Sequence, residues 1–171
     1  RLRIGERSVL SGIGKRPVDG PVAVARLGLE GDEQADLSVH GGLDKAVYAY
    51  PAAHYAFWHA ARRERKVSLF DETLPPGFMG ENLTVEGLLE HDVYVGDRLH
   101  FPDCVLRVTA PREPCYKFNA ALGFNTAVKT MGHSGFCGFY LSVDEAGSVQ
   151  AGEAFELVPG PRQLSIPQRV A

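Results

Sequence analysis

One cysteine lies where its neighbours favour a reactive thiolate. Cys115 occupies the fifth position of the run Pro-Arg-Glu-Pro-Cys-Tyr-Lys at residues 111–117, between the cations Arg112 and Lys117. The two prolines restrict the backbone around the thiol. Nearby cations lower the pKa of a thiol from about 8.5, and the thiolate is the form that attacks electrophiles and binds metals. The pattern therefore predicts a nucleophilic or metal-binding Cys115. The alternative is a structural cysteine in an apolar core, the usual environment of a free thiol.

The residues that follow Cys115 favour a short helix. The segment from Tyr116 to Leu122 is compatible with a helix and ends at Gly123, and Pro114 precedes it, which fits the preference for proline at helix starts and glycine after helix ends. We therefore expect Cys115 at a helix N-terminus, where unpaired backbone N–H groups and the helix dipole stabilise an anion.

A glycine pair forms the second candidate site. Residues 39–45 contain His40, Gly41 and Gly42 and end at Lys45. Consecutive glycines let backbone N–H groups turn towards one point, and His40 and Lys45 add a titratable donor and a fixed positive charge. The segment predicts an anion site, with a plain glycine turn between two strands as the alternative. It lacks the spacing of a phosphate-binding P-loop or of a dinucleotide-binding turn.

Two acidic segments are weaker candidates. Residues 28–36 are acidic and broken by glycines, but Asp32, Gln34 and Asp36 are not followed by the glycine and glutamate of a calcium loop. A solvated turn is favoured there over a cation site. The run Gly-Glu-Asn-Leu at residues 80–83 offers a carboxylate and an amide beside the start of a strand, and a turn with a strand cap is the alternative.

Several other kinds of site are excluded by spacing. The six histidines, at positions 40, 54, 59, 91, 100 and 133, form no helical pair that suits zinc. No Gly-x-Ser-x-Gly motif of a serine hydrolase is present. The three cysteines, Cys104, Cys115 and Cys137, are an odd number without a Cys-x-x-Cys pair, which indicates a reducing, cytoplasmic setting rather than a disulfide framework.

Length and charge narrow the class of protein further. A chain of 171 residues suits one domain, with residues 1–171 forming a single unit. The formal net charge is -3, and the one dense basic cluster, at residues 62–66, suits the solvated end of a helix. Nucleic acid is therefore not expected as the main partner. No apolar run reaches the roughly 20 residues of a membrane span, so no membrane association is expected.

Turns and short β-branched segments predict a mostly β fold. The 19 glycines and 11 prolines separate short apolar runs, which is typical of a barrel or sandwich. Residues 95–101 and 104–109 flank a Pro-Asp turn and predict a hairpin. Further strands are expected at residues 8–10, 22–25, 46–50, 82–85, 93–95, 149–157 and 164–166.

Helices are expected at three places. Residues 51–65 place His54, Phe57, Trp58 and Ala61 on one face, so we expect this helix to cover the core with its aromatic side chains. Shorter helices are expected at residues 115–122 and 125–131. Residues 66–79 contain Pro-Pro-Gly and predict a long exposed loop.

Taken together, four segments resemble the MOSC domain family, named after the C-terminal domain of molybdenum cofactor sulfurases. They are residues 28–48, with Val-His-Gly-Gly-Leu-Asp-Lys at 39–45, then Gly-Glu-Asn-Leu-Thr at 80–84, Val-Tyr-Val-Gly-Asp at 93–97 and Pro-Arg-Glu-Pro-Cys-Tyr-Lys at 111–117. The resemblance covers residues 8–158 and is closest to the bacterial branch linked to resistance against N-hydroxylated purine analogues.

The resemblance implies a mostly β fold, a closed or partly open barrel with a few short helices. It also implies a molybdenum–pterin cofactor. On this basis the motif cysteine of the protein, here Cys115, ligates the molybdenum or carries sulfur. The cofactor-binding residues expected on this basis are Lys15, Gly41, Gly42, Lys45, Asn82, Arg112 and Lys117. His40 is expected as a proton donor or a further cofactor contact. The family is also associated with pyridoxal phosphate.

For activity, the resemblance implies a reductase of N-hydroxylated purines or related bases that receives electrons from a separate redox protein. A second reading is a cofactor-binding sulfur carrier that holds a persulfide on Cys115 and reduces no organic substrate. A third is an anion-binding barrel without chemistry. A homodimer is also expected. Relatives carry a C-terminal helical segment that this sequence, ending at Ala171, is expected to lack.

Overall fold

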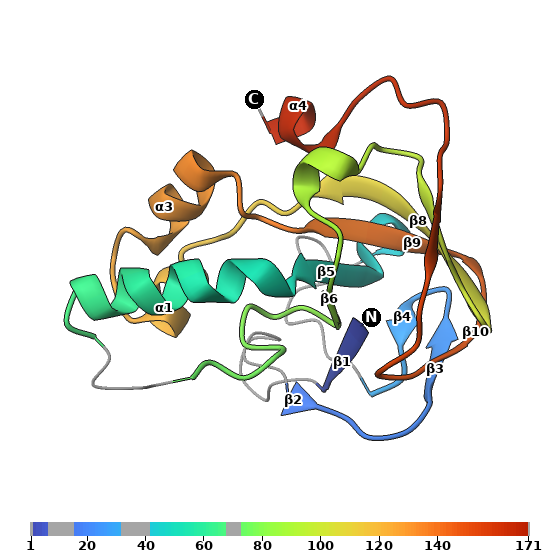
Figure 1. Ribbon diagram of the computed structural model, residues 1–171, viewed down its shortest axis with the longest axis horizontal. Coiled ribbons are helices and arrows are strands. Elements are labelled where there is room, and N and C mark those ends of the chain that lie inside the picture. The colour runs from blue at the N-terminus through green and yellow to red at the C-terminus, as the bar shows by residue number, and fades with distance from the viewer. Residues whose placement is uncertain (1, 7–15, 32–41, 68–72, 171) are drawn as a thin grey trace.

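A curled, mostly antiparallel sheet dominates the computed structural model, which describes residues 2–6, 16–31, 42–67 and 73–170 (Figure 1). Its eight strands lie in the order β11-β7-β8-β9-β5-β6-β1-β2, and only β5 and β6 run parallel. The strands are β1 (Leu2–Glu6), β2 (Arg16–Pro17), β5 (Val47–Pro51), β6 (Leu83–Val85), β7 (Arg98–Phe101), β8 (Cys104–Pro111), β9 (Phe139–Glu145) and β11 (Glu156–Val158).

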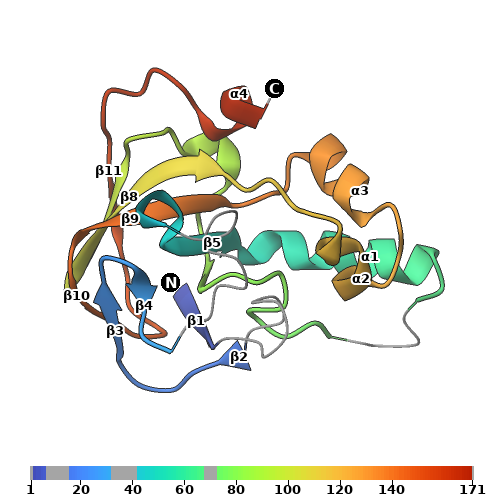
Figure 2. The same cartoon turned by 180° about the vertical axis from the view of Figure 1, so that it is seen from behind.

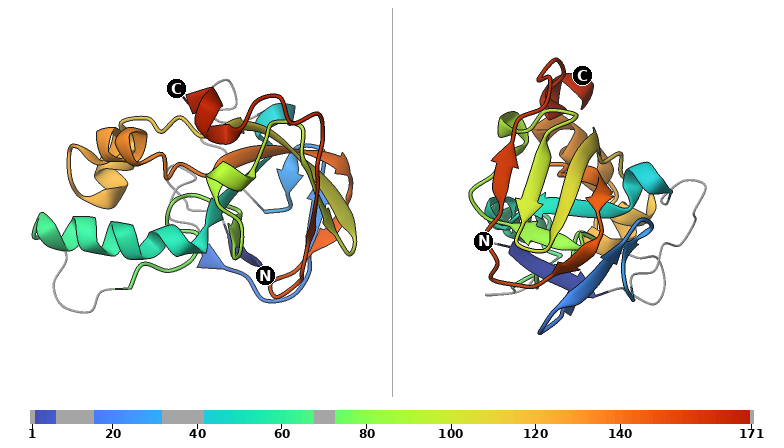
Figure 3. Two further views of the ribbon diagram at one scale, coloured as in Figure 1. Left: turned by 45° about the horizontal axis from the view of Figure 1, so that its top comes forward. Right: turned by 90° about the vertical axis from the view of Figure 1, so that its right-hand side faces the viewer.

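A second, three-stranded sheet covers one end of the large sheet. It is formed by β10 (Gly147–Val149), β3 (Val22–Ala25) and β4 (Gly28–Leu29) in that order. Gly28 has a φ of 128°, and a Cβ there would lie 2.4 Å from the carbonyl oxygen of Ala46, so the close approach of β4 requires glycine. Seen along the long axis, the strands wrap into a half-barrel, which confirms the predicted fold class (Figure 3).

The predicted hairpin is present and supplies part of the curvature. β7 and β8 pair antiparallel from Phe101 and Cys104 outward, with Pro102 and Asp103 at the turn. The register between β8 and β9 shifts at two places, between Val105 and Leu106 and between Val108 and Ala110. Such irregularities bend a strand and increase its twist, which helps this part of the sheet to curl.

Helices gather at the end of the molecule away from the small sheet (Figures 1 and 2). They are α1 (Tyr55–Glu64), α2 (Lys117–Leu122) and α3 (Ala127–Ser134), whereas α4 (Ile166–Val170) packs against β8. Three short 3-10 segments complete the described elements: η1 (Leu43–Lys45), η2 (Ala52–His54) and η3 (Glu90–Asp92). Trp58 of α1 is fully buried and meets Phe118 of α2 edge to face, so the predicted aromatic face of this helix is confirmed.

Several element boundaries differ from the sequence-based expectations. Cys115 lies two residues before α2 instead of inside a helix, and the helix expected from residue 125 begins at Ala127. Residues 164–166 form no strand, because Ser165 makes one isolated bridge to Tyr94 and the next residue starts α4.

Two further expectations are also corrected. Residues 93–95 contribute only the Tyr94 side of the isolated bridge to Ser165 and form no strand. Part of the loop expected to be exposed at residues 66–79 is buried, at Leu74 and Met79, and the amide of Leu74 donates a hydrogen bond to His59 of α1 at 2.8 Å. The strand expected at residues 8–10 lies outside the described residues. Within the described residues, no helix is long and apolar enough to cross a bilayer.

Candidate functional site

Adjacent strands bring three of the four sequence motifs into one row. Pro111 of β8 is the register partner of Phe139 in β9, Phe139 pairs with Ala49 in β5, and Ala49 pairs with Leu83 in β6. The segments around residues 42–48, 80–84 and 111–117 therefore converge at one end of the sheet, although they are far apart in the sequence. β9, which no motif predicted, lies in the middle of this row.

Arg112 fixes the cysteine motif to the sheet. Its guanidinium Nη1 donates hydrogen bonds to the carbonyl oxygen of Met79 at 2.5 Å and to the hydroxyl of Tyr48 at 3.3 Å. It also lies 4.9 Å from the ring centre of Tyr48 and 5.1 Å from that of Phe118. Burial opposes its charge, but the neighbouring tyrosines raise the pKa of Arg112 above its ordinary value. Arg112 is therefore a buried, permanently charged group beneath the motif.

Lys45 lies above a second tyrosine of the same row. Its Nζ is 5.4 Å from the ring centre of Tyr140 in β9, and this ring lies 5.3 Å from that of Tyr48. Burial raises the pKa of Tyr140, Arg112 opposes the shift, and negative charge on Cys115 and Glu113 adds to it. The charges of Arg112 and Cys115 both act on Tyr140, and Lys45 lies over its ring; we call these four residues the thiol cluster.

Cys115 differs from the other two cysteines in exposure. It is partly exposed, whereas Cys104 and Cys137 are buried, and none of the three forms a disulfide. Burial raises the pKa of both Cys104 and Cys137 to about 12, so these thiols stay protonated at neutral pH. The carbonyl oxygen of Cys115 accepts a hydrogen bond from the amide of Phe118 at 2.9 Å, which forms the turn that leads into α2. The structure thus presents the motif cysteine at the surface.

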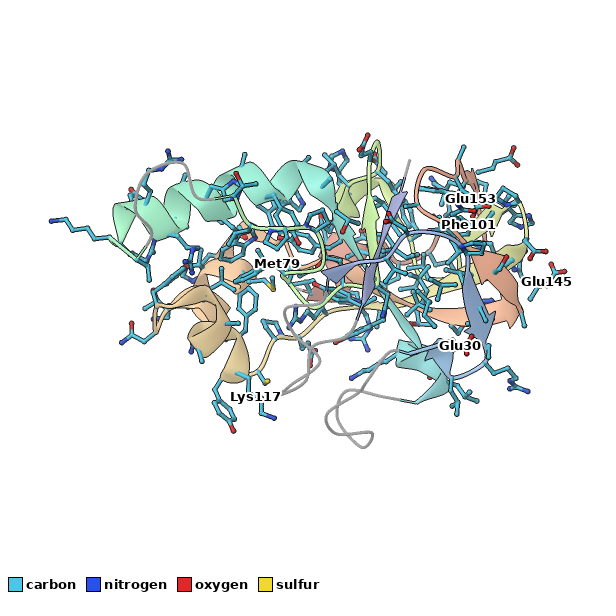
Figure 4. All side chains as sticks on the ribbon, turned by 90° about the horizontal axis from the view of Figure 1, so that it is seen from below. Glu30, Met79, Phe101, Lys117, Glu145 and Glu153 are labelled. Atoms are coloured by element: carbon cyan, nitrogen blue, oxygen red, sulfur yellow. The ribbon has the colours of Figure 1, made fainter. Side chains whose placement is uncertain are left out.

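The other predicted site residues fall into three groups. Lys117 is the first residue of α2 and lies at the outer edge of the helical end, whereas Met79 lies further inside (Figure 4). Gly42 immediately precedes η1 and has a φ of 94°, a conformation that glycine adopts without strain. Lys15, His40 and Gly41 lie outside the described residues, so their predicted roles stay predictions.

Asn82 is buried and joins two strands. Its side-chain oxygen accepts a hydrogen bond from the backbone N–H of Tyr48 at 2.8 Å, and its backbone N–H donates to the carbonyl oxygen of Tyr48 at 2.8 Å. These bonds hold β5 at the point where it passes the 80–84 motif. The arrangement makes Asn82 a residue that positions Tyr48, and its predicted contact with a cofactor stays a prediction.

A carboxylate next to Asn82 organises a hydrogen-bond network, in the run for which the sequence left open a polar candidate site and a turn with a strand cap. Glu81 is fully buried, and its oxygens accept hydrogen bonds from the hydroxyls of Tyr55 at 2.6 Å and Thr84 at 2.9 Å and from the amide of Met79 at 3.1 Å. Burial raises the pKa of Glu81, and the hydrogen bonds from Tyr55 and Thr84 oppose the shift. Glu81 thus holds Met79, whose carbonyl oxygen receives Arg112.

A second buried pair supports the start of β9. His54 lies 2.6 Å from Glu90, and the other carboxylate oxygen of Glu90 accepts a hydrogen bond from the amide of Gly138 at 2.8 Å. The His54 ring also stacks on Phe136 with centres 3.9 Å apart. These contacts give His54 a structural role in the core. Across the described part of the chain, no group of three or more His, Cys, Asp and Glu side chains is arranged to hold a metal ion by itself.

The donor set at Cys115 fits a metal that reaches the protein as part of an anionic cofactor. A single accessible sulfur supplies one soft ligand, which suits molybdenum better than a hard oxygen-binding ion. The buried charge of Arg112 and the charge of Lys45 favour negatively charged groups nearby. A metal that needs several protein ligands has no matching site among the described residues.

Comparison with known proteins identifies the domain. Residues 36–156 match the MOSC domain. The chain is 39% identical over 166 residues to the uncharacterized protein YflK of Bacillus subtilis, covering 96% of this chain and 72% of the relative. It is 38% identical over 161 residues to the protein YiiM of Escherichia coli, covering 94% and 70%. A protein of Gibberella moniliformis named reductase is 34% identical over 154 residues, which are 90% of this chain and 26% of that protein.

Solved structures share the architecture. The crystal structure of YiiM from Escherichia coli superposes with a TM-score of 0.79 at 30% identity, covering 99% of this chain and 74% of that one. YiiM from Geobacillus stearothermophilus gives a TM-score of 0.77 at 30% identity, with 99% and 79% covered. The half-barrel and its helices are therefore a fold that these relatives share.

Proposed function

The chain belongs to the MOSC domain family, and from that premise we propose that it is a cytoplasmic, molybdenum-cofactor-dependent reductase of N-hydroxylated purines and related bases. The observation that carries the proposal is the partly exposed Cys115 beside the cations Arg112 and Lys45. The relative named reductase supports the reaction class, although this chain corresponds to only 26% of that protein.

In this proposal Cys115 holds the metal through its sulfur. Arg112, Lys45, Lys117 and Lys15 contact the cofactor's phosphate or pterin, because cations on the protein stabilise its negative charge. Arg112 acts from a fixed position, since its guanidinium is tied to Met79 and Tyr48. When bound, the cofactor supplies the electron transfer that breaks the N–O bond.

The overall reaction requires a reductant and protons. Conversion of an N-hydroxylated amine to the amine consumes two electrons and two protons and releases the oxygen as water. A separate redox protein supplies the electrons in our proposal. His40 is the proposed proton donor, because a histidine titrates near neutral pH and can protonate the departing oxygen.

The experiment that tests the function compares Cys115→Ser with Cys104→Ala. Both variants and the wild type are produced in cells that synthesise the cofactor, and reduction of N-hydroxylated purine is measured with a chemical one-electron donor. We expect the wild type and Cys104→Ala to be active and Cys115→Ser to lose more than about 100-fold in rate, because even weaker perturbations near a metal cost 10–100-fold. Full activity of Cys115→Ser would refute the proposal. A labile extra sulfur atom on Cys115 without reductase activity would favour the sulfur carrier.

A further inference from the structure

Among four buried tyrosines around the core of the sheet, Tyr140 alone makes no hydrogen bond through its hydroxyl to any described residue. The hydroxyl of Tyr48 donates to the carbonyl oxygen of Cys137 at 2.5 Å, that of Tyr50 donates to Phe136 at 2.8 Å, and that of Tyr55 donates to Glu81 at 2.6 Å. Tyr140 is only 8% exposed, as deeply buried as Tyr55. Buried tyrosine hydroxyls normally find a partner, so an exception calls for an explanation.

The position of Tyr140 supplies that explanation. In the sheet, Tyr140 pairs with Tyr48 of β5 on one side and with Ala110 of β8 on the other. Ala110 immediately precedes the cysteine motif at residues 111–117. Lys45 lies over one face of the Tyr140 ring, and the charges of Arg112 and Cys115 both act on the pKa of this tyrosine. Tyr140 is therefore a member of the thiol cluster and not of the core networks that fix Tyr48, Tyr50 and Tyr55.

We propose that the Tyr140 hydroxyl donates a hydrogen bond to a negatively charged oxygen of the ligand that Cys115 holds. The inference rests on the proposed function for the identity of that ligand, but the hydrogen bond itself does not require reductase activity. None of the four sequence motifs contains this tyrosine, which lies in the apolar run that forms β9.

The positive charges around Tyr140 favour a negatively charged ligand oxygen as the acceptor. Lys45 and Arg112 both favour an anion, and a hydrogen bond to an ionised acceptor is about twice as strong as one between neutral groups. A tyrosine has an ordinary pKa of about 10, so its phenol carries a proton at neutral pH and can act as a donor. The carboxylate of Glu113 also faces the cluster, but this side chain is exposed and solvent weakens its effect.

The same chemistry can come from two sources, a phosphate group of the cofactor or an oxygen bound to its metal. Inorganic phosphate and molybdate are therefore the two probes, and both are tested on protein purified without cofactor. The measurement is the rate at which iodoacetamide alkylates Cys115 as the anion concentration rises, followed by mass spectrometry of the peptide. An anion bound beside the thiol shields it and slows this reaction.

We expect at least one of the two anions to protect Cys115 in the wild type, and Tyr140→Phe to need about 10-fold more anion for the same protection. This factor corresponds to one hydrogen bond to an ionised group. Tyr116→Phe is the matched control, because this tyrosine is adjacent to Cys115 but 76% exposed, and its protection curve should equal that of the wild type. Protection by phosphate assigns the oxygen to a phosphate group, and protection by molybdate alone assigns it to the metal.

Two results would overturn the inference. One is equal protection in Tyr140→Phe and the wild type, and the other is no protection of the wild type by either anion. Thermal unfolding shows whether Tyr140→Phe folds; if it does not, Lys45→Gln at the surface-lying η1 takes its place and should weaken protection by a similar factor. Because no turnover is measured, a failure of this inference is distinguishable from a failure of the reductase proposal.

Discussion

Two polar regions of the molecule lie on the two sides of β5 in the same sheet and differ in how their hydrogen bonds are used. Beneath α1, the network of Glu81, Tyr55 and Thr84 is closed, since each hydroxyl and both carboxylate oxygens have protein partners. In the thiol cluster, Tyr140 has no such partner among the described residues, and Cys115 is partly exposed. The closed network stabilises the fold, whereas the thiol cluster is where we propose that a ligand binds.

Arg112 connects the two regions. Its guanidinium is held by the carbonyl oxygen of Met79, whose amide donates to Glu81, and its charge acts on Tyr140 of the thiol cluster. A rigid, fully bonded support is what a binding site needs if its groups are to stay in place without a ligand.

The largest expected difference is between the alkylation rates of the Cys115 and Cys137 thiols. With excess iodoacetamide at about pH 7.5, we expect Cys115 to be alkylated at least about 1000-fold faster than Cys137. Burial raises the pKa of Cys137 to about 12, so less than about one molecule in ten thousand carries the thiolate, and its sulfur is also inaccessible. Peptide mass spectrometry at timed intervals gives both rates. Comparable rates would mean that the structure misplaces the accessible sulfur.

Removal of the buried carboxylate should affect stability strongly. We expect Glu81→Ala to lower the free energy of unfolding by about 3 kcal/mol, because the hydroxyls of Tyr55 and Thr84 lose their buried acceptor. Glu113→Ala is the control, since this carboxylate is exposed and its loss should change stability by less than about 0.5 kcal/mol. Urea unfolding measures both, and equal effects would contradict the division between support and site.

A smaller effect should appear as a pH dependence. Burial raises the pKa of Glu81 above its ordinary value of 4.5, so the folded protein retains this proton at pH values where the unfolded chain has lost it. The stabilisation is therefore complete below about pH 4.5 and decreases by up to about 1.4 kcal/mol per pH unit as the pH rises through the folded-state pKa. Glu81→Gln lacks this titration, so the difference between wild-type and variant stability should show this slope. A difference that does not change with pH would contradict a raised pKa.

Much of the architecture could be predicted from local sequence patterns. The hairpin around Pro102 and Asp103 follows from a turn between alternating segments, and the buried face of α1 follows from the spacing of its aromatic residues. The mostly β class, a barrel or a sandwich, follows from many short strands separated by glycine and proline, and the resemblance to the MOSC family selects the barrel. These features depend on neighbours within a few residues, which is why they are visible without a structure.

Other features depend on long-range pairing and were missed or misplaced. Tyr140 appears in the sequence as one aromatic residue of an apolar strand, and only the register of β9 between β5 and β8 brings it to Cys115. For Glu81 the sequence leaves open a polar site and a turn with a strand cap, because its environment depends on Tyr55, 26 positions away. Residues 164–166 look like a strand locally, but Ser165 makes a single bridge and α4 begins next to it.

The central claim is that Cys115 holds a molybdenum cofactor, and the most direct test is the metal content of the purified protein. Wild type, Cys115→Ser and Cys104→Ala are expressed in cells that synthesise the cofactor and analysed for molybdenum by mass spectrometry. The account predicts molybdenum in the wild type and in Cys104→Ala and its loss from Cys115→Ser, with all three proteins folded. Equal molybdenum in Cys115→Ser, or none in the folded wild type, would contradict it.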